Sequence, residues 1–442
     1  MADTDIAVIG AGPTGRGVAA LATALGLKVT LFARGPMGGE APEPGLTQAT
    51  LRALARRAAQ GAPRPDWTAV RARLAEADAD AAPDSTQARF EGIGIEVVRA
   101  AARFGGPDMV AAAGGEWRFR RALIATGSTP VIPPLEGLET VPYLTADTIH
   151  SVADRPSHLI VLGAEGFGLE MAQAFARLGA RVTVVGAGRI APGADPDLAG
   201  GLARALARDG VGIIEDAEAV AVRRAGEGVA LVLADGRLLE GSHLLLALGR
   251  APYLAGLDLA TAALPGAMPV VDASLRVAGN RCLWAAGGAI GRSGAGDIGI
   301  LARSMLFRLP AFLSQGQPVA LRAIRTEPAL VEIGAPAEAD EALRWPLSDT
   351  PGAAAQGVEG LVKLRVDRRG RLSGAGLLAP GGLEMAGMLA MAIGRPVSAL
   401  AGATLPYPTL SAAIARAALE HRAPDLGRPA VRWLAGIAKR LP

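Results

Sequence analysis

A glycine-rich turn near the start of the chain has the spacing that can hold the phosphates of a dinucleotide. Gly10, Gly12 and Gly15 form a G-x-G-x-x-G motif that follows a short apolar run and precedes an alanine-rich stretch. The first glycine permits a tight turn, the second lets a pyrophosphate approach the backbone, and the third lets the following helix pack closely. The N–H groups at the start of that helix then face the anion. The motif predicts a dinucleotide site, and a turn that serves packing alone is the alternative.

A second turn of the same kind carries a defect. Gly163 and Gly168 keep the outer positions of the motif, but Glu165 replaces its middle glycine. We expect this carboxylate to add bulk and negative charge where a pyrophosphate would approach, each costing about 1 kcal/mol or more in a partly buried site. The interpretation that we favour is a structural relic that no longer binds phosphate.

Both turns also lack the acidic residue that usually holds the adenosine ribose at the end of the second strand. That position lies 33 − 10 = 23 residues after Gly10 and is Ala33. In the second turn it lies 186 − 163 = 23 residues after Gly163 and is Gly186. Losing one such charged hydrogen bond weakens binding by roughly 1.5–3 kcal/mol.

The elements that must position these turns follow a repeated strand–turn–helix–strand pattern. Short apolar runs predict buried parallel strands, and alanine- and leucine-rich stretches predict helices. The first unit has strands at 5–9 and 28–33 around a helix at 15–25, and the second has strands at 158–162 and 181–185 around a helix at 169–178. Two such units predict an α/β fold with two Rossmann-like dinucleotide-binding domains.

The rest of the chain completes the expected architecture. Residues 128–157 are rich in proline and polar side chains, which is typical of a crossing between domains. From about residue 316 the pattern changes to separate strands and helices, which predicts a C-terminal α+β domain. The other expected elements are helices within 48–80, strands within 94–124 and 228–248, a strand at 283–286, a strand at 360–366 and a helix at 383–393.

Further segments, in chain order, are similar to the motifs of one protein family. They are Ala125–Pro130, Leu248–Pro252, Ala285–Gly288, Thr326–Pro328 and Tyr407–Ser411. With the first glycine motif, they resemble the A-T-G-S-x-P, G-R-x-P and A-A-G-D segments and the interface domain of the pyridine nucleotide–disulfide oxidoreductases, such as dihydrolipoamide dehydrogenase and mercuric reductase. The match is collinear from residue 5 to about residue 420. The subgroup that the chain resembles most is the mercuric-reductase-like bacterial flavoproteins.

This resemblance implies a cofactor and a division into domains. The fold would comprise two dinucleotide-binding domains of the three-layer FAD/NAD(P) type and a C-terminal α+β dimerisation domain. The implied boundaries are 1–150 with 250–315 for the FAD-type domain, 151–249 for the NAD(P)-type domain and 316–442 for the interface domain. The residues implied in FAD binding are Gly10, Gly12, Gly15, Thr126, Gly127 and Gly287.

The resemblance also implies a partner chain, and the defective second glycine turn argues against NAD(P). In this family the interface domain forms a homodimer and completes each active site from the other chain, so we expect a homodimer through the C-terminal domain. Because the loop from Gly163 to Gly168 is defective, NAD(P) is not expected there.

The groups that carry the family's redox chemistry are missing from this chain. The two redox cysteine positions are Ala41 and Leu46, so the dithiol reaction is excluded. The lysine near the flavin aligns with Thr50, while its glutamate partner is retained as Glu170 and is expected to lack that partner. The flavin-contacting aspartate of the A-A-G-D segment aligns with Gly288.

Other candidate reactive groups give no catalytic prediction. The histidine and glutamate of the family's C-terminal acid–base pair align with Tyr407 and Ala412, and alanine cannot orient a base. Cys282 lies in an expected strand, where an inert buried thiol is favoured. No metal site is predicted, because no two histidines have metal-ligand spacing. Arg16 could contact a phosphate, although a solvated helix residue is the interpretation that we favour.

Composition narrows the classes of partner. Lysine and arginine total 45 and aspartate and glutamate 42, and a net charge of +3 in 442 residues gives no reason to expect nucleic acid. We find no run of about 18 apolar residues, so no transmembrane segment is expected. The N-terminus does not resemble a secretory signal, and the cytoplasm is the expected compartment.

The end of the chain, residues 428–441, has helical spacing with apolar and basic faces. Val431, Leu434, Ile437 and Leu441 lie near one face, with Arg432, Lys439 and Arg440 elsewhere. This predicts a weak basic amphipathic helix that could touch a membrane surface or a partner protein. Packing within the protein's own dimer is the interpretation that we favour.

Three hypotheses about function stay open. The first is a flavoprotein oxidoreductase that keeps FAD and passes electrons to a quinone, oxygen or a carrier protein. The second is a non-catalytic descendant that serves as a structural or binding subunit of a larger assembly, which the number of lost groups favours. The third is a nucleotide sensor in which the first loop binds FAD or another adenine nucleotide without turnover.

Overall fold

The chain folds as two compact units, each built from separate stretches of sequence. The computed structural model describes residues 3–35, 44–81, 86–264, 266–292, 296–308, 319–421 and 429–439. Unit 1 comprises Met1–Ser157, Val220–Val232 and Leu238–Pro318, and unit 2 comprises His158–Ala219, Leu233–Arg237 and Val319–Pro442. The three-domain division of the sequence analysis is finer than these two units and stays a prediction.

The centre of unit 1 is a seven-stranded sheet with the order β3-β2-β1-β6-β5-β4, in which β16 also pairs with β6. Its parallel core consists of β3, β2, β1, β6 and β16. The strands are β1 (Thr4–Ile9), β2 (Val29–Phe32), β3 (Glu96–Val98), β4 (Arg103–Gly106), β5 (Met109–Ala112), β6 (Gly115–Ile124) and β16 (Leu283–Ala285).

Strand β1 shows why the sequences of the buried strands in this sheet are continuous apolar runs. Ile6 and Val8 belong to the core on one face of the sheet, and Ala7 and Ile9 belong to the core on the other face. All four side chains are at most 3% exposed. A strand that is covered on both faces needs apolar residues at every position, as is usual in parallel sheets.

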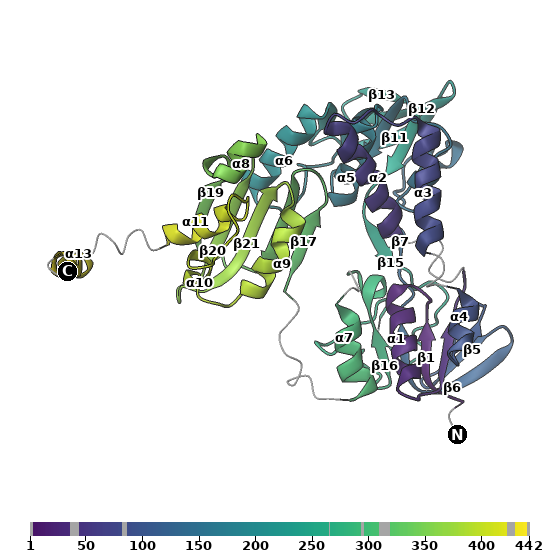
Figure 1. The fold of residues 1–442 in the computed structure, drawn as a ribbon. Helices are drawn as coiled ribbons and strands as arrows, with labels where there is room; N and C mark the ends of the chain where they lie inside the picture. The colour runs from purple at the N-terminus through teal and green to yellow at the C-terminus, as the bar shows by residue number, and fades with distance from the viewer. Residues whose placement is uncertain are drawn as a thin grey trace. The chain divides into compact units, whose positions relative to one another are not determined.

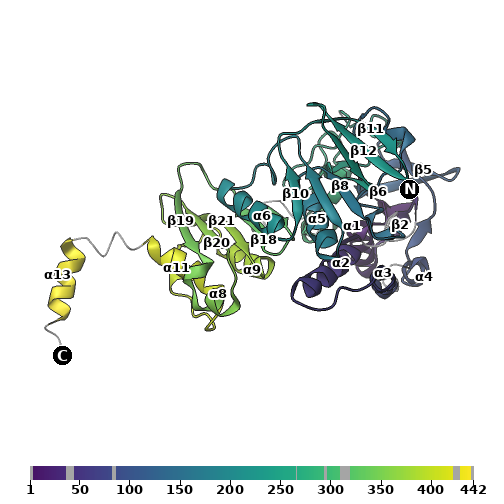
Figure 2. The same ribbon diagram turned by 90° about the horizontal axis from the view of Figure 1, so that it is seen from above.

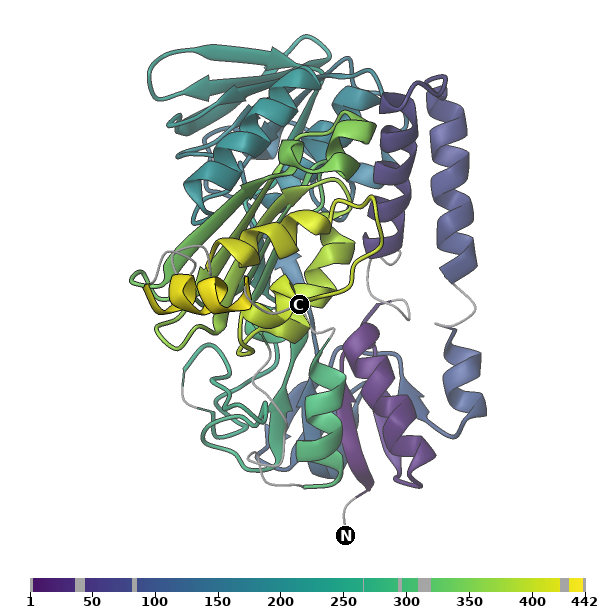
Figure 3. The ribbon, with the colours of Figure 1, turned by 60° about the vertical axis from the view of Figure 1, so that its left-hand side comes forward.

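Helices α1 and α4, at Pro13–Ala24 and Gln87–Gly92, pack against strands of this sheet. Helix α1 (Pro13–Ala24) packs beside α7 (Asp297–Leu301), as Figure 1 shows. The helices α2 (Pro44–Ala59) and α3 (Trp67–Ala81) run side by side (Figure 3). The remaining helical segments are α4 (Gln87–Gly92), the 3-10 turns η2 (Leu138–Thr140), η3 (Ile149–Ser151) and η4 (Gly287–Ile290), and the π-helical turn η5 (Ala302–Leu306).

Two smaller sheets are built from strands that come, along the sequence, just before the first stretch of unit 2 or between its stretches. Strand β7 (Ser128–Pro130) pairs antiparallel with β15 (Arg250–Pro252). A three-stranded sheet has the order β11-β12-β13. Its strands and the strand that follows it are β11 (Ala219–Ala225), β12 (Gly228–Leu233), β13 (Leu238–Gly241) and β14 (His243–Leu246).

Unit 2 contains the second strand–turn–helix–strand repeat. Strands β8 (His158–Leu162), β9 (Arg181–Val185) and β10 (Val211–Ile214) are parallel neighbours. Helix α5 (Gly166–Arg177) follows the second glycine turn, and α6 (Pro196–Arg208) precedes β10. Asp195 caps the start of α6, since its carboxylate accepts a hydrogen bond from the Asp197 N–H group at 3.0 Å.

The rest of unit 2 is a five-stranded antiparallel sheet with the order β17-β18-β21-β20-β19, shown from above in Figure 2. The strands are β17 (Leu321–Ile324), β18 (Ala329–Gly334), β19 (Glu341–Pro346), β20 (Leu361–Val366) and β21 (Leu372–Ala379). The helical segments are η7 (Leu347–Asp349), α8 (Pro351–Gln356), α9 (Gly382–Ala392), α10 (Ser398–Ala401), α11 (Ala412–Glu420) and α13 (Pro429–Ala438).

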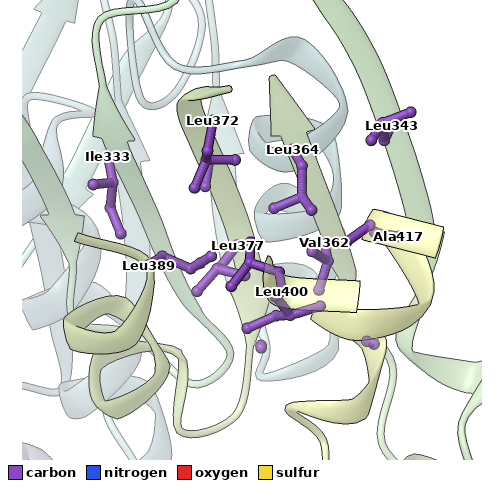
Figure 4. Packing of buried hydrophobic residues seen from close by; sticks show 14 of the residues in the cluster. Ile333, Leu343, Val362, Leu364, Leu372, Leu377, Leu389, Leu400 and Ala417 are labelled. Carbon is purple, nitrogen blue, oxygen red and sulfur yellow. The ribbon is translucent and has the colours of Figure 1, made fainter. Parts of the chain in front are cut away.

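One apolar core joins this sheet to its helices. Figure 4 shows Val362 of β20 and Leu377 of β21 near Leu400 of α10, with Leu389 of α9 beside Leu377. Leu364, Leu377 and Leu389 are fully buried. At about 25 cal/mol for each Å² of buried apolar surface, such a cluster is the main source of stability for the α+β part of the unit.

Helix α6 lies on β18 and β21, and ion pairs join it to β20. Lys363 of β20 is 8% exposed, and its ammonium lies 2.6 Å from an Asp195 carboxylate oxygen and 2.8 Å from one of Asp197. Arg344 of β19 adds a contact with Asp197 at 3.1 Å. The end of the second dinucleotide-type repeat is therefore tied to the antiparallel sheet by charge as well as by packing.

The predicted fold class is confirmed. The chain is α/β, with two Rossmann-like arrangements of parallel strands and helices and an α+β region at its C-terminal end. Among the described residues, no helix is both long enough and apolar enough to cross a bilayer.

Candidate functional site

The first glycine turn joins β1 to α1 through two close backbone approaches. A Cβ atom on Gly10 would lie 2.2 Å from the Ala125 carbonyl oxygen, and one on Gly15 would lie 2.0 Å from the Gly10 carbonyl oxygen. Gly10 also has a φ of +112°, which disfavours other residues. These two glycines are therefore required by the fold of the turn itself.

Gly12 differs from its two neighbours in the motif. A Cβ atom on Gly12 would meet no heavy atom within 4 Å, and its φ of −70° suits any L-residue. The fold of the described chain thus places no demand for glycine at this position. The protein's own atoms do not require glycine here. Close approach of a ligand to the backbone would explain it.

The start of α1 can receive an anion. Gly12 is the N-cap residue and provides no side-chain cap, and Pro13 is the first helical residue. The Arg16 N–H group makes the first backbone hydrogen bond of the helix, to the Gly12 carbonyl at 2.9 Å. The N–H groups of Thr14 and Gly15 precede that bond, so they point out of the positive end of the helix dipole.

Thr126 and Gly127 lie next to this turn. The end of β6 is parallel to β1, with Ile124 beside Ile9, and the Ala125 N–H donates to the Ile9 carbonyl at 2.8 Å. The Thr126 hydroxyl oxygen is buried and has no hydrogen-bond partner among the residues that the structure describes. A buried hydroxyl is costly when it lacks a partner, so its position favours a ligand atom there.

Gly287 is positioned beside the same strand but is already engaged. Its N–H group donates to an Asp297 carboxylate oxygen at 2.9 Å. Asp297 is 1% exposed and also forms an ion pair with Arg292. Asp297 is a functional candidate that the sequence motifs do not indicate, and its only signal there is an acidic residue within a stretch of glycine and apolar residues. The Gly287 N–H group is thus engaged by a carboxylate of the chain itself and is not available to a cofactor.

Gly288, which the resemblance predicts to stand at the position of the family's flavin-contacting aspartate, is closely surrounded by backbone. A Cβ atom there would lie 2.8 Å from the Gly127 carbonyl carbon and 2.9 Å from the Ser128 nitrogen. These atoms belong to the main chain and cannot move aside as a flexible side chain would. The segment that follows β16 therefore lies in close contact with the backbone of the loop after β6.

Among the described residues, Ala33–Gly35 follow β2 and provide no carboxylate where an adenosine ribose would be held. Ala33 is 2% exposed, and its N–H donates to the Val98 carbonyl at 2.9 Å. The next residue, Arg34, stacks on the Tyr253 ring at 4.2 Å and donates to its hydroxyl group. An arginine and a phenol therefore lie beside the ribose position, which the sequence analysis did not predict. Arg16 is 8% exposed, so the prediction of a solvated residue was wrong.

The second glycine turn has a different defect from the one predicted. Gly163 and Gly168 are buried, with a φ of +119° at Gly163, but Glu165 is exposed at the N-cap of α5. The negative charge of Glu165 thus stands at the helix start, and the expectation that it opposes a pyrophosphate stays a prediction. A Cβ atom on Gly186 would lie 2.8 Å from the Ala164 Cβ and 2.9 Å from the Gly188 carbonyl oxygen, so the loop itself excludes a ribose carboxylate.

Glu170 has acquired new partners. This carboxylate on α5 is 4% exposed and accepts a hydrogen bond from the Arg325 N–H at 2.8 Å. The Arg325 guanidinium lies 3.8 Å from the same oxygen. The expectation that Glu170 would lack a partner was wrong, because the loop before Thr326 supplies one. Burial of a carboxylate is tolerated here because a backbone donor and an arginine compensate it.

The remaining predicted positions are divided between the two units. Ala41 lies outside the described residues, and Leu46 is 39% exposed in the first turns of α2. Tyr407 is 81% exposed, and Ala412 is the first residue of α11. Cys282 is a half-buried free thiol. In the part of the chain that the structure describes, no cluster of three metal-ligating side chains occurs.

Comparisons with known proteins identify the family. The model of the pyridine nucleotide-disulphide oxidoreductase family matches residues 4–304. The chain is 32% identical over 94% of its length to a mercuric reductase of Streptomyces lividans, covering 95% of that protein. It is 30% identical over 69% of its length to an NAD(P)H dehydrogenase (quinone) of Mycobacterium tuberculosis, covering 65% of that protein.

A solved structure has the same fold over nearly the whole chain. The crystal structure of LpdA from Mycobacterium tuberculosis superposes with a TM-score of 0.80 at 26% identity, covering 95% of this chain and 99% of that one. The ordered motifs, the two Rossmann-like repeats and the similarity across nearly the whole length agree. The chain belongs to the pyridine nucleotide-disulphide oxidoreductase family.

Proposed function

We propose that this chain is a flavoprotein that binds FAD through its first glycine turn and does not reduce disulfides. Members of its family bind FAD. The observation that carries the proposal is the open space over Gly12 at the uncapped start of α1. Both features fit a pyrophosphate, and neither is required by the packing of the described residues.

The chain's own residues would hold the cofactor mainly by backbone. Gly12 and the first N–H groups of α1 would receive the pyrophosphate, and the buried Thr126 hydroxyl would gain a partner. Gly127, whose Cβ position meets no heavy atom within 4 Å, leaves room beside it. FAD, when bound, supplies a group that accepts and donates electron pairs. With Ala41 and Leu46 in place of the cysteines, those electrons need a non-thiol acceptor.

We propose FAD binding and assign no redox step. Reduction of an acceptor such as a quinone needs reduced FAD, and NAD(P)H, the donor in the name of one relative, is excluded from this proposal. NAD(P) binding at the Gly163 turn is not part of the proposal, because the Glu165 charge and the closed Gly186 loop oppose it. Assembly as a homodimer through the C-terminal region and a cytoplasmic location remain predictions.

A second candidate function rests on a different observation. Asp297 takes the Gly287 N–H group, and backbone fills the space beside Gly288. Both features oppose a flavin at that end of the site and favour a non-catalytic subunit of a larger assembly. The family's fold would then be retained as a binding or structural body.

A substitution at Gly12 separates folding from cofactor binding. In Gly12→Asp the new side chain meets open space, and aspartate is a good N-cap residue, so the apoprotein should be at least as stable as wild type. Its carboxylate would occupy the place of the pyrophosphate and repel it. The matched control is Gly92→Asp, since the Cβ position of Gly92 on α4 is equally open.

The measurement is the flavin absorption band of the purified protein, followed by titration of FAD into apoprotein. We expect wild type and Gly92→Asp to bind FAD, and Gly12→Asp to bind it at least about tenfold more weakly, a loss of about 1.4 kcal/mol or more. A wild-type protein that stays colourless with added FAD would refute the flavoprotein proposal and favour the non-catalytic subunit. Equal binding by both variants would refute the role of the turn.

A further inference from the structure

The C-terminal helix α13 has an apolar face that is open to solvent. Trp433, Leu434 and Ile437 are 66%, 58% and 40% exposed, and none of the described residues of this helix is buried. At about 100° per residue, these three side chains fall within roughly 100° of one another around the helix axis. They therefore form one continuous stripe along the helix.

The basic residues of α13 and its end lie on the opposite side. Arg432 and Lys439 are seven residues apart, so they point in nearly the same direction, about 140–160° away from Ile437 and Leu434 and about 100–120° away from Trp433. Both are exposed. A helix with tryptophan and aliphatic residues on one face and cations on the other has the composition of helices that lie in the plane of a membrane surface.

The charge of the whole chain is concentrated in this tail. The last 21 residues contain five basic side chains and one acidic one, a net charge of +4, so the remaining 421 residues carry 3 − 4 = −1. No acidic residue follows Asp425. Such a segregation of charge complements an anionic surface, whereas the rest of the protein has little net attraction to one.

We propose that α13 docks this protein on an anionic lipid bilayer. The helix would lie parallel to the surface, with Trp433, Leu434 and Ile437 inserted at the boundary of headgroups and acyl chains. Its ten residues span about 15 Å, half of the hydrocarbon thickness, so it cannot cross the bilayer. A second copy of the chain is the other candidate occupant, but it would not account for the cations opposite the apolar stripe.

The docking surface uses no residue of the candidate FAD site, so it can be tested separately from the proposed function. Full-length protein is sedimented with vesicles of phosphatidylcholine alone and with vesicles that contain phosphatidylglycerol. The apolar stripe is removed in the double variant Trp433→Ser, Ile437→Ser. The matched control is Met391→Ser, which removes a side chain that is 73% exposed on α9. The charges are removed in the double variant Arg432→Gln, Lys439→Gln.

We expect wild type and Met391→Ser to bind the phosphatidylglycerol vesicles and to bind phosphatidylcholine weakly. The apolar double variant should lose at least about tenfold in binding, and the glutamine variant roughly fivefold for each charge. Absence of binding to both vesicles, equal binding to both, or unchanged binding by the apolar variant would overturn the proposal. Conversion of a dimer to a monomer by the apolar variant, measured by light scattering in the absence of vesicle binding, would assign the stripe to a second copy.

Discussion

Replacing Lys363 by methionine should destabilise unit 2, because it leaves two carboxylates without their main cation. The Lys363 ammonium donates to both oxygens of Asp195, at 2.7 and 2.6 Å, and to Asp197 at 2.8 Å. Methionine keeps most of the side-chain volume, so the packing of β20 against α6 should change little. The measured loss in the free energy of unfolding should therefore come from the broken ion pairs and not from a cavity.

The magnitude follows from how far the carboxylates can reach solvent. Removing one partner of a fully buried ion pair costs about 3–5 kcal/mol. Here the side chains of Asp195 and Asp197 remain 24% and 42% exposed, and Arg344 stays 3.1 Å from Asp197. Solvent and Arg344 then compensate part of the stranded charge, so we expect a loss of about 2 kcal/mol.

The cluster also sets a pH dependence. The hydrogen bond from Lys363 lowers the pKa of Asp197 below its usual 3.8. A carboxyl group whose folded-state pKa is lowered stabilises the fold above its unfolded-state pKa and loses that contribution as the pH falls through the lower value. The difference between wild type and the Lys363→Met variant should therefore be complete at neutral pH and shrink below about pH 4.

Thermal unfolding at neutral pH tests the prediction. For a unit of this size, about 2 kcal/mol corresponds to a fall in Tm of about 4–8 °C. The control is Arg208→Met, because Arg208 and Glu359 form an ion pair whose side chains are 59% and 72% exposed, and an exposed pair contributes little to stability. If Lys363→Met and the control shift Tm equally, the reasoning about the buried cluster is wrong. Adding Asp197→Asn to Lys363→Met should restore part of the loss.

Further predictions concern unit 1. Burial lowers the pKa of His150 below 6.5, so the folded state resists protonation of this side chain. The stability of the protein should therefore decline as the pH falls below about 6.5. His150→Gln should reduce this decline in stability, which is checked by measuring Tm across the same pH range. Asp297→Asn should cost about 1–3 kcal/mol in chemical unfolding, because a buried carboxylate with an arginine partner is lost, and an unchanged midpoint would contradict this. The Arg121 guanidinium donates to the Met305 and Leu306 carbonyls at 2.6 and 3.0 Å, so Arg121→Met should cost about 1–3 kcal/mol and increase hydrogen exchange in η5, whereas unchanged exchange there would exclude a capping role.

The turns that carry the candidate site could be predicted because their geometry demands particular residues. Gly10 and Gly15 stand where any side chain would collide with a carbonyl oxygen, and the strand–turn–helix pattern around them is local in the sequence. Helix boundaries were displaced by only a few residues. The first predicted helix began at 15, whereas α1 begins at Pro13, since proline is favourable at the first helical position.

Contacts between distant segments could not be predicted in this way. The sequence alone presents Glu170 as a carboxylate that has lost its lysine, yet Arg325 approaches it from 155 residues away. Asp297 accepts a hydrogen bond from the Gly287 N–H group, ten residues earlier, and no periodic pattern in the sequence predicts that contact. Periodicity reports which face of an element is buried, but it contains no information about which polar groups meet inside the fold.

The crowding around Gly288 has a consequence for any attempt to engineer a flavin contact there. An aspartate at this position would place its Cβ atom 2.8 Å from the Gly127 carbonyl carbon, so the neighbouring peptide would have to shift before the side chain could be accommodated. A design that aims to add an acidic group to this site would therefore need a compensating change in the loop after β6, or a different position for the carboxylate.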